Sequence, residues 1–231
     1  MKRTFCKFFI IISSFTLSAC ASVYVPNAVN VPMLDKAGDV QLGAHTGING
    51  FDLQASAAIT DNFAVMLNGA FLSETGDTNN YRKRKFGEIG LGYFTSFREM
   101  GRFEVYAGYG VGKTSAMDDF EIPGVWTNYA EGSYSRIFVQ PSIGMESKVV
   151  DFGLAMRVAY VQIYSLKNKV DDINFEENST YYEPVVFVRV GAPPVKLSFQ
   201  WGFSRSSSKD MLFLDPNSTI MSFGIVVNLF Q

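Results

Sequence analysis

Residues 195–203 have the sequence VKLSFQWGF, in which apolar and polar side chains alternate without interruption. Residues 221–229, with the sequence MSFGIVVNL, follow the same rule with one exception at Val226. A period of two places alternate side chains on opposite faces of a β-strand. One face is a full row of large apolar side chains, and the other consists mainly of Gly, Ser, Gln, Asn and Lys. This asymmetry predicts strands with one face against an apolar medium.

From Gly38 onward the chain consists of similar alternating segments joined by turns and loops. Strands of about 9–11 residues, tilted near 45°, cross the hydrocarbon layer of a membrane. A sheet in lipid must close on itself, because an unpaired edge would leave polar backbone groups without partners. The sequence therefore predicts an all-β fold, a closed antiparallel up-and-down transmembrane β-barrel of 10 strands with a polar, plugged lumen. The segments are residues 40–48, 51–59, 63–71, 85–97, 103–111, 135–145, 152–160, 184–190, 195–203 and 221–229.

The connections between these segments alternate between short turns and long polar loops. Asn49-Gly50 is the exception, because this type I′ turn signal makes the first hairpin short where a long loop is expected. The turns are residues 60–62, 98–101, 148–150 and 192–194, and the loops are residues 73–84, 115–131, 166–181 and 206–218. This arrangement resembles the outer-membrane β-barrels of Gram-negative bacteria, whose short turns are periplasmic. The resemblance implies a bacterial outer-membrane location with extracellular long loops.

Aromatic residues lie near the ends of the segments, where outer-membrane barrels carry aromatic girdles at the two membrane surfaces. We predict interface positions for Tyr93, Phe97, Trp201 and Phe230. Phe230, next to last in the chain, also resembles the C-terminal aromatic residue of barrel proteins.

The N-terminal residues have the pattern of a secretory signal. Basic residues within 1–7 precede an apolar stretch at 8–15, which is too short to span a membrane as a helix. Residues 17–20, Leu-Ser-Ala-Cys, resemble the lipobox of bacterial lipoproteins, in which the cysteine carries a diacylglycerol on its sulfur. The resemblance implies lipidation of Cys20. The sequence Ala-Cys-Ala also fits ordinary signal cleavage after Ala21, and this alternative stays open.

These features divide the chain into a lipoprotein signal peptide (1–19), a lipid-anchored N-terminal tether (20–37) and an outer-membrane β-barrel (38–231). With an even number of strands, the N-terminus is expected to be anchored on the periplasmic side. The chain has 22 acidic and 20 basic residues, and cleavage removes three of the basic ones. The negative charge that remains argues against nucleic acid as a partner. Cys20 is the one cysteine of the mature chain, which excludes a disulfide framework and a Cys-based metal site.

Residues 108–114, GYGVGKT, contain part of a phosphate-binding pattern. Ala107 stands where that pattern needs its first Gly. The stretch also alternates like a strand, whereas a phosphate loop must curl so that successive N–H groups converge. We therefore predict no nucleotide partner and no cofactor.

Charged residues of both signs fall on the polar face of the predicted strands. A ten-stranded barrel is narrow, and charges buried in it must pair. We predict an interior salt-bridge network that plugs the barrel, with a narrow polar conduit as the alternative. By parity the inward charges are Asp52, Glu88, Glu104, Arg136, Glu146, Arg157, Glu183, Arg189 and Lys196.

His45 is the only histidine and also falls on the inward face. Outer-membrane barrel enzymes, both proteases and lipid deacylases, resemble one another in using a histidine beside acidic or Ser partners at the extracellular rim. No His-x-Ser pattern accompanies His45. We therefore predict a structural lumen histidine, no catalytic residue, no metal site and no enzymatic activity.

Residues 21–34 are uncharged and contain Val, Pro and Asn, unlike a flexible polar tether. We expect them to lie extended against the periplasmic mouth of the barrel or against a partner, with a passive linker as the alternative. The predicted function is a non-enzymatic outer-membrane lipoprotein with a structural or envelope-complex role. Its expected partners are outer-membrane lipid and another envelope protein, bound through the long loops or residues 21–34. Alternatives are a lipid or peptide hydrolase, a narrow passive channel, and a lipid-tethered, lipocalin-like barrel whose polar face is outward.

Overall fold

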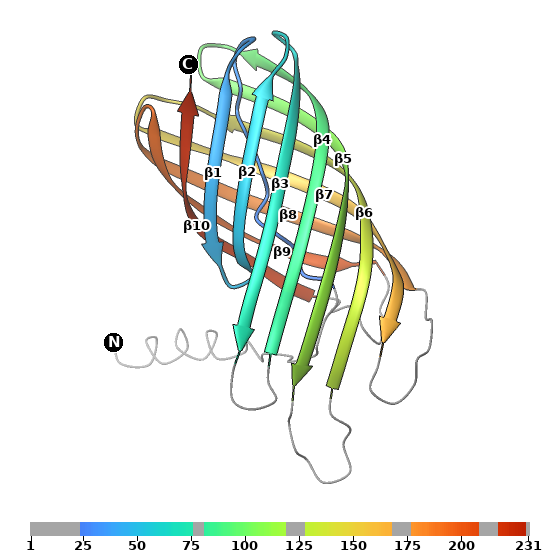
Figure 1. Cartoon of the computed structure of the whole chain (residues 1–231). Helices are drawn as coiled ribbons and strands as arrows, with labels where there is room; N and C mark the ends of the chain where they lie inside the picture. Colours follow the sequence, from blue (N-terminus) through green and yellow to red (C-terminus); the bar gives the residue numbers. More distant parts are fainter. Residues whose placement is uncertain (1–23, 76–80, 119–127, 168–176, 208–216, 230–231) are drawn as a thin grey trace, which may run out of the picture.

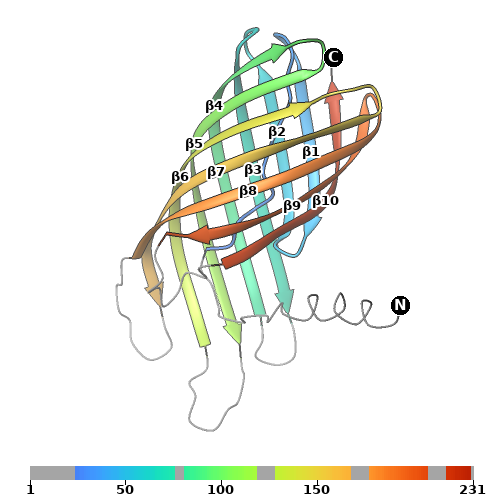
Figure 2. The same cartoon turned by 180° about the vertical axis from the view of Figure 1, so that it is seen from behind.

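The strands form a closed barrel. The computed structural model describes residues 24–75, 81–118, 128–167, 177–207 and 217–229. Each strand pairs antiparallel with its neighbours in the sequence, and β1 pairs with β10 to close the sheet (Figures 1 and 2). The strands are β1 (Val40–Gly47), β2 (Gly50–Ala58), β3 (Phe63–Thr75), β4 (Tyr81–Phe97), β5 (Gly101–Asp118), β6 (Asn128–Met145), β7 (Val150–Lys167), β8 (Glu177–Ala192), β9 (Val195–Ser206) and β10 (Asn217–Leu229). The predicted closed barrel of 10 strands is confirmed. In the described part of the chain, no helix is long and apolar enough to cross a membrane.

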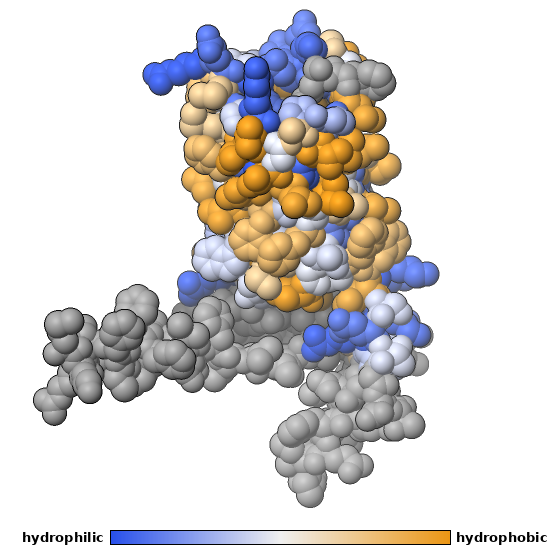
Figure 3. Space-filling model, turned by 90° about the vertical axis from the view of Figure 1, so that its left-hand side faces the viewer, coloured by the Kyte–Doolittle hydropathy of each residue, from blue (hydrophilic) through white to orange (hydrophobic). Residues whose placement is uncertain are grey.

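Large apolar side chains cover the outer surface of the barrel. Leu91 is 67% exposed and Leu197 66%, whereas Lys196 and Gln200 are buried in the lumen. Figure 3 shows a wide hydrophobic belt with hydrophilic residues beyond both of its edges. An apolar surface of this extent fits acyl chains and not water. The lipocalin-like alternative is therefore wrong, because it requires the polar face to point outward.

The two ends of the barrel differ in how the strands are joined. At the short-turn end, the connections are residues 59–62, 98–100, 146–149 and 193–194. β1 begins and β10 ends at this end (Figure 1). The opposite, long-loop end carries the longer connections together with the β1–β2 hairpin.

Strands β4 to β8 extend further toward the long-loop end than the alternation predicted. β4 begins at Tyr81 and β5 ends at Asp118, so the predicted loops at 73–84 and 115–131 are partly strand. β6, β7 and β8 are extended in the same way. Beyond the hydrocarbon layer the outer face needs no apolar side chains, so the ladder continues where the alternation ends. The predicted loop boundaries were wrong for this reason.

The β1–β2 hairpin is short, as predicted, but has a different turn. Gly47 pairs with Gly50, which leaves Ile48 and Asn49 as the loop. Gly50 has a φ of 110°, whereas neither loop residue has a positive φ. A type I′ turn requires positive φ at both loop positions, so this prediction was wrong. Asn49 Nδ2 donates to the Thr219 carbonyl at 3.0 Å, which attaches the hairpin to β10.

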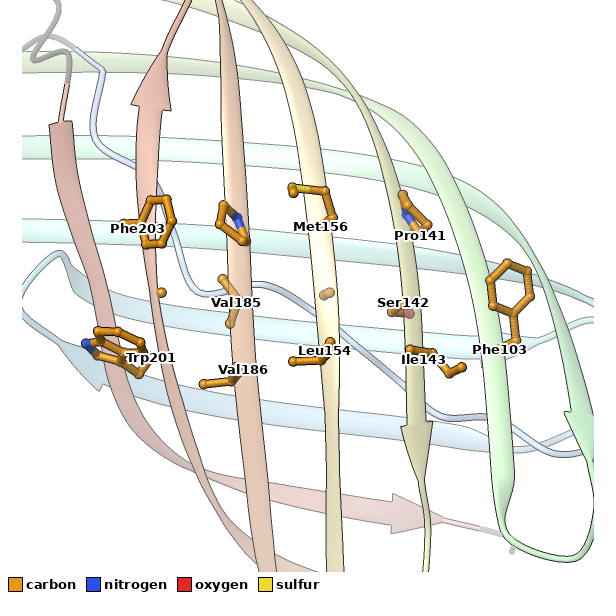
Figure 4. A pocket seen from close by; sticks show the side chains of 13 residues that line it. Phe103, Pro141, Ser142, Ile143, Leu154, Met156, Val185, Val186, Trp201 and Phe203 are labelled. Carbon is orange, nitrogen blue, oxygen red and sulfur yellow. The ribbon is translucent and has the colours of Figure 1, made fainter.

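Prolines interrupt the wall at one level. Pro141 lies inside β6, where the sequence predicts a bulge because proline cannot donate a hydrogen bond to the ladder. The pairing of β6 with β7 is interrupted at Pro141 without a change of register, and the register shift lies instead between Gly132 and Tyr134. Pro184 of β8 faces Met156 of β7, and the pairing of β8 with β9 lapses beside it. An apolar groove of about 430 Å³ lies on the outer wall over these interruptions (Figure 4).

A charge placed at the middle of the hydrophobic belt should destabilise the barrel. Leu91 lies there, opposite Val65 and Ala107. Leu91→Arg is expected to lower the free energy of unfolding by about 2–4 kcal/mol, because a guanidinium group would lie among acyl chains. Urea titration of the protein in lipid vesicles measures this change. Leu91→Ala controls for lost contacts, and equal losses in the two variants would contradict a membrane-facing Leu91.

Candidate functional site in the occupied lumen

Residues 24–34, which we call the lumen segment, run through the interior of the barrel (Figure 1). Nearly all of them are buried. Close to the short-turn end, the Leu34 N–H donates to Glu104 Oε1 at 3.2 Å. At its other end, the ring of Tyr24 packs against that of Tyr134, which lies in the long-loop half of β6. The segment therefore extends from the start of β1 through the lumen toward the long-loop end.

Side chains of the barrel wall satisfy the backbone of the lumen segment, which has no neighbouring strand. The Val29 N–H donates to Gln200 Oε1 at 3.0 Å, and the Val29 carbonyl accepts from Gln200 Nε2 at 2.8 Å. One wall amide thus supplies both hydrogen bonds that a strand partner would make. Buried peptide groups require such partners. Further backbone contacts join Arg84 to Pro26, Arg157 to Asn27, Asp52 and Gln54 to Ala28, Gln140 to Asn30, Arg189 to Val31, and Gln41 to Pro32.

The side chains of the lumen segment contact opposite walls in alternation. Asn30 Nδ2 donates to Ser56 Oγ of β2 at 3.0 Å and to Asn68 Oδ1 of β3 at 2.7 Å. Apolar residues on either side of Asn30 pack against β7, β8 and β10 across the lumen. This apolar cluster consists of Val29, Val31, Met33, Ala155, Val185, Phe187 and Ile220. The Val and Asn content of the segment therefore matches the two surfaces between which it lies.

Tyr24 joins the lumen segment to two buried charges. Its hydroxyl donates to Glu183 Oε1 at 2.8 Å and accepts from Arg136 Nη1 at 2.9 Å. The Tyr24 ring centroid lies 5.6 Å from that of Tyr134 and 4.6 Å from that of Tyr181. A buried phenol needs both an apolar surface for its ring and a polar partner for its hydroxyl. Tyr24 has both at this position.

Four of the predicted lumen charges form two buried ion pairs. Arg136 pairs with Glu88, and Arg157 Nε lies 2.5 Å from Glu183 Oε2. Both arginines also bind Asn27 of the lumen segment, Arg136 through the Asn27 side chain and Arg157 through its carbonyl. Buried pairs hold only when their remaining donors and acceptors are satisfied. The lumen segment supplies part of that requirement.

Three other members of the predicted network bind the backbone of the lumen segment. Asp52 accepts a hydrogen bond from the Ala28 N–H at 3.4 Å. Glu104 accepts from the Leu34 N–H, and Arg189 donates to the Val31 carbonyl. Wall carboxylates therefore face peptide N–H groups, and a wall guanidinium faces a carbonyl. The network is completed by the peptide and not by side chains alone.

The last two predicted charges pair with residues that the sequence analysis missed. Lys196 Nζ lies 2.6 Å from Asp151 Oδ1, and Glu146, just beyond β6, lies 3.1 Å from Arg102 Nη2. Arg84, which binds the lumen segment, was missed too. All three omitted residues immediately precede a predicted strand. Starting each of these predicted strands one residue earlier would have placed them on the inward face.

The remaining predicted sites occupy varied positions. Cys20 and Phe230 lie outside the described residues. Tyr93, Phe97 and Trp201 are exposed on the outer wall.

His45 is buried in the lumen wall opposite Asp52. Neither ring nitrogen has a hydrogen-bond partner among the described residues. The ring packs so closely on Gly224 that a Cβ there would lie 2.3 Å from His45 Cδ2. Within the described ranges, no three His, Cys, Asp or Glu side chains come together as a metal site would need.

The path of the N-terminal segment corrects the prediction made from sequence. Residues 24–34 lie inside the lumen and not against its periplasmic mouth, and Tyr24 lies away from the short-turn end where the N-terminus was expected. The physical reason is that the wall arginines need oxygen acceptors, which the segment carbonyls provide. Residues 24–34 are thus almost entirely buried within the barrel.

A closed sheet with an apolar outer face and an occupied polar lumen defines a transmembrane β-barrel. No protein-family model and no curated protein matches this chain.

Solved structures of similar fold include the translocator domain of autotransporter NalP from Neisseria meningitidis, at 13% identity and TM-score 0.46, covering 84% of this chain and 76% of that one. The attachment invasion locus protein Ail of Yersinia pestis has 10% identity and TM-score 0.36, with 84% and 99% covered. The CymD monoaromatic hydrocarbon channel has 9% identity and TM-score 0.41, with 84% and 67% covered. At this distance the comparisons carry no argument about function.

Removal of the Tyr24 hydroxyl should weaken the attachment of the lumen segment. Tyr24→Phe leaves Arg136 and Glu183 each without one hydrogen bond while keeping the ring contacts. Hydrogen bonds to charged groups contribute about 1.5–3 kcal/mol, so we expect a loss of that order in urea unfolding. Tyr164→Phe, at an exposed position on β7, is the control. Equal stability of both variants would show that the Tyr24 contacts are not formed.

Proposed function

We propose that this chain is a non-enzymatic outer-membrane lipoprotein whose barrel is closed by its own N-terminal segment. We further propose that its lipidated Cys20 lies on the long-loop, extracellular side. The observation that carries the proposal is the path of the lumen segment, which is buried along its length and bonded to the wall at nearly every residue. The role that fits is structural, or an interaction within an envelope assembly that binds the long loops.

The occupied lumen argues against a conduit. A channel needs a continuous polar path, whereas residues between Tyr24 and Leu34 fill the interior with side chains from both the segment and the wall. Moving the segment would remove the Asn27 oxygens that Arg136 and Arg157 bind, although their pairs with Glu88 and Glu183 would remain. Taking one partner from a buried charge is destabilising. The closed state is therefore the stable one.

The surroundings of His45 argue against a hydrolase. A catalytic histidine needs a hydrogen-bonded nucleophile or acid and access to substrate. His45 is 1% exposed, and its ring packs on Gly224 without a hydrogen-bonded Ser or Asp among the described residues. A structural role in the wall fits these surroundings.

The reach of the chain supports the proposed side for Cys20. The chain from Cys20 to Tyr24 spans at most ~14 Å. From Tyr134, which packs on Tyr24, to Met145 at the short-turn end, β6 covers about 36 Å, or roughly 26 Å along the axis of a barrel tilted near 45°. Cys20 cannot return to the short-turn end over that distance. The anchor that we propose is on the opposite side from the one that the sequence alone predicted.

The rim of the barrel at the long-loop end is lowest at the short β1–β2 hairpin, beside the lumen segment. Arg84 Nη1 donates both to the Pro26 carbonyl at 3.4 Å and to the Asn49 carbonyl at 3.3 Å, so the segment passes beside this hairpin. Ile48 and Phe51, which are 52% and 44% exposed, bring the apolar outer surface close to the same rim. Acyl chains on Cys20 can enter the membrane here without passing over the taller wall of β4 to β8.

A second attachment to the membrane then has a physical purpose. The lumen segment is held at one end by its continuity with β1, and a lipid would hold the other end. With both ends fixed, the segment stays at a high effective concentration in the lumen and cannot slide out. The lipid would stabilise the plug and not the membrane insertion of the barrel.

Deletion of the lumen segment should open a conducting path. The full-length protein is expected to show no steady conductance in planar lipid bilayers, and a variant lacking residues 24–34 is expected to show discrete steps. Heat-modifiable gel migration confirms that the variant forms a barrel. Equal conductance of the two proteins would refute closure by the segment, as would a folded deletion variant that remains silent.

Cysteine labelling should place the N-terminal end on the long-loop side. The sulfur of a lipidated Cys20 cannot react with a maleimide, so a new cysteine is needed as the reporter. Ser22→Cys is expected to react with a membrane-impermeant maleimide on intact cells to the same extent as Lys83→Cys near the long-loop end. Lys148→Cys in the β6–β7 turn should react only after permeabilisation. Labelling of Ser22→Cys in the pattern of Lys148→Cys would reverse the proposed side. Incorporation of an alkyne fatty acid, lost in Cys20→Ala, tests lipidation separately.

A further inference from the structure

The outer face of β4 and β5 changes from apolar to cationic toward the long-loop end. The hydrophobic belt on this wall includes Ile89 and Tyr109, which pair across β4 and β5, and ends at Val111. The next outward pair is Gly87 with Val111, and the one after it is Lys85 with Lys113. Lys83 follows one outward position further along β4. These three lysines therefore lie just outside the hydrocarbon layer, at the level of lipid headgroups.

The lysines of this cluster repel one another in the absence of an anion. Lys85 and Lys113 are directly opposite in the β4–β5 register, an arrangement that destabilises a sheet. Lys83 Nζ lies 5.5 Å from the centroid of the Tyr81 ring. None of the ion pairs formed within the described residues includes any of the three lysines. Glu131 lies nearby and has an interaction of its own. The cluster thus keeps positive charge for an anion.

Two adjoining hollows lie on the outer wall beside the three lysines. A polar cleft of about 340 Å³ lies between Lys83, Lys85 and Lys113. A more apolar groove of about 500 Å³ lies below it, lined by Phe71, Gly87, Val111 and Tyr164 among others. Both hollows include Lys85, Lys113 and Ser133. A charged group in the cleft and an apolar chain in the groove would therefore be continuous.

Gly87 lines the groove and fills none of it, because it has no side chain. A Cβ placed on Gly87 would meet no atom nearer than 3.9 Å, the carbonyl oxygen of Asn68. The sheet therefore has room for a larger residue, and the backbone does not require glycine at this position. The missing side chain leaves space on the outer face beside Val111, at the edge of the hydrophobic belt.

We propose that this surface binds one phosphate-bearing anionic lipid of the leaflet at the long-loop end. Its phosphate lies between Lys85 and Lys113 with Lys83 beside it, and one acyl chain lies in the groove over Gly87. The lysine ammonium groups recognise the phosphate as compact charges, and the position at the belt edge matches the height at which lipid phosphates lie. The proposal needs only a barrel in a bilayer and is independent of lipidation at Cys20.

Native mass spectrometry of the purified full chain in detergent tests this site. The probes are phosphatidylglycerol, lipid A, phosphatidylcholine and inorganic phosphate. Because each lysine near a lipid surface contributes about fivefold to affinity, the variant Lys85→Gln/Lys113→Gln should bind the anionic lipids roughly 30-fold more weakly. The matched control, Lys36→Gln/Lys148→Gln at the short-turn end, should bind as the wild type does. The anionic lipid that binds more tightly identifies the source of the phosphate.

Gly87→Leu separates the acyl groove from the charge. It should weaken binding of both anionic lipids at least tenfold while leaving the three lysines intact, with Gly87→Ala as the smaller alternative should the leucine side chain impair folding. Equal loss in the short-turn control, equal binding of phosphatidylcholine, or retention of lipid by both Gly87 variants would overturn the proposal. Inorganic phosphate binding as tightly as lipid would also overturn it, because the site would then serve a soluble anion.

Discussion

The structure depends on one constraint, which is that every buried peptide group and charge must find a polar partner. Toward the membrane, the closed ladder from β1 to β10 meets this requirement for the wall. In the lumen, the requirement falls on the segment from Tyr24 to Leu34, whose backbone has no strand beside it. Wall side chains such as Gln200 take the place of that strand. The lumen segment is ordered because the wall is polar in the right places.

The same contacts explain why the wall keeps so many charges. Arg136 and Arg157 bind both an acidic residue of the wall and Asn27 of the segment, and Arg189 binds a segment carbonyl. Glu104 faces a segment N–H. Arg136 and Arg157 therefore have partners on two sides, and removing the segment would leave several buried charges with one partner fewer. The plug and the charge network form one structural unit.

The uneven rim of the barrel connects the inside to the outside. Strands β4 to β8 extend beyond the hydrophobic belt, whereas β1 and β2 end at a two-residue loop beside which Pro26 passes. The taller wall carries the lysines that face the headgroup layer, and the lower wall leaves room for the N-terminal end of the lumen segment. Both proposals for the membrane follow from this difference in height. The short Asn49 hairpin, an exception to the loop pattern, forms the lower part of this rim.

Alternation along segments such as 195–203 was sufficient to determine the barrel, the number of strands and which side chains face inward, because a period of two leaves one arrangement of a strand in lipid. It could not locate the strand ends of β4 to β8, where no apolar face is needed. Nor could it pair Lys196 with Asp151 or Arg136 with Glu88, since parity gives a face and not a register. Only the tertiary structure placed residues 24–34 in the lumen, because an uncharged stretch of Val, Pro and Asn becomes a plug only when the wall that surrounds it supplies its hydrogen bonds.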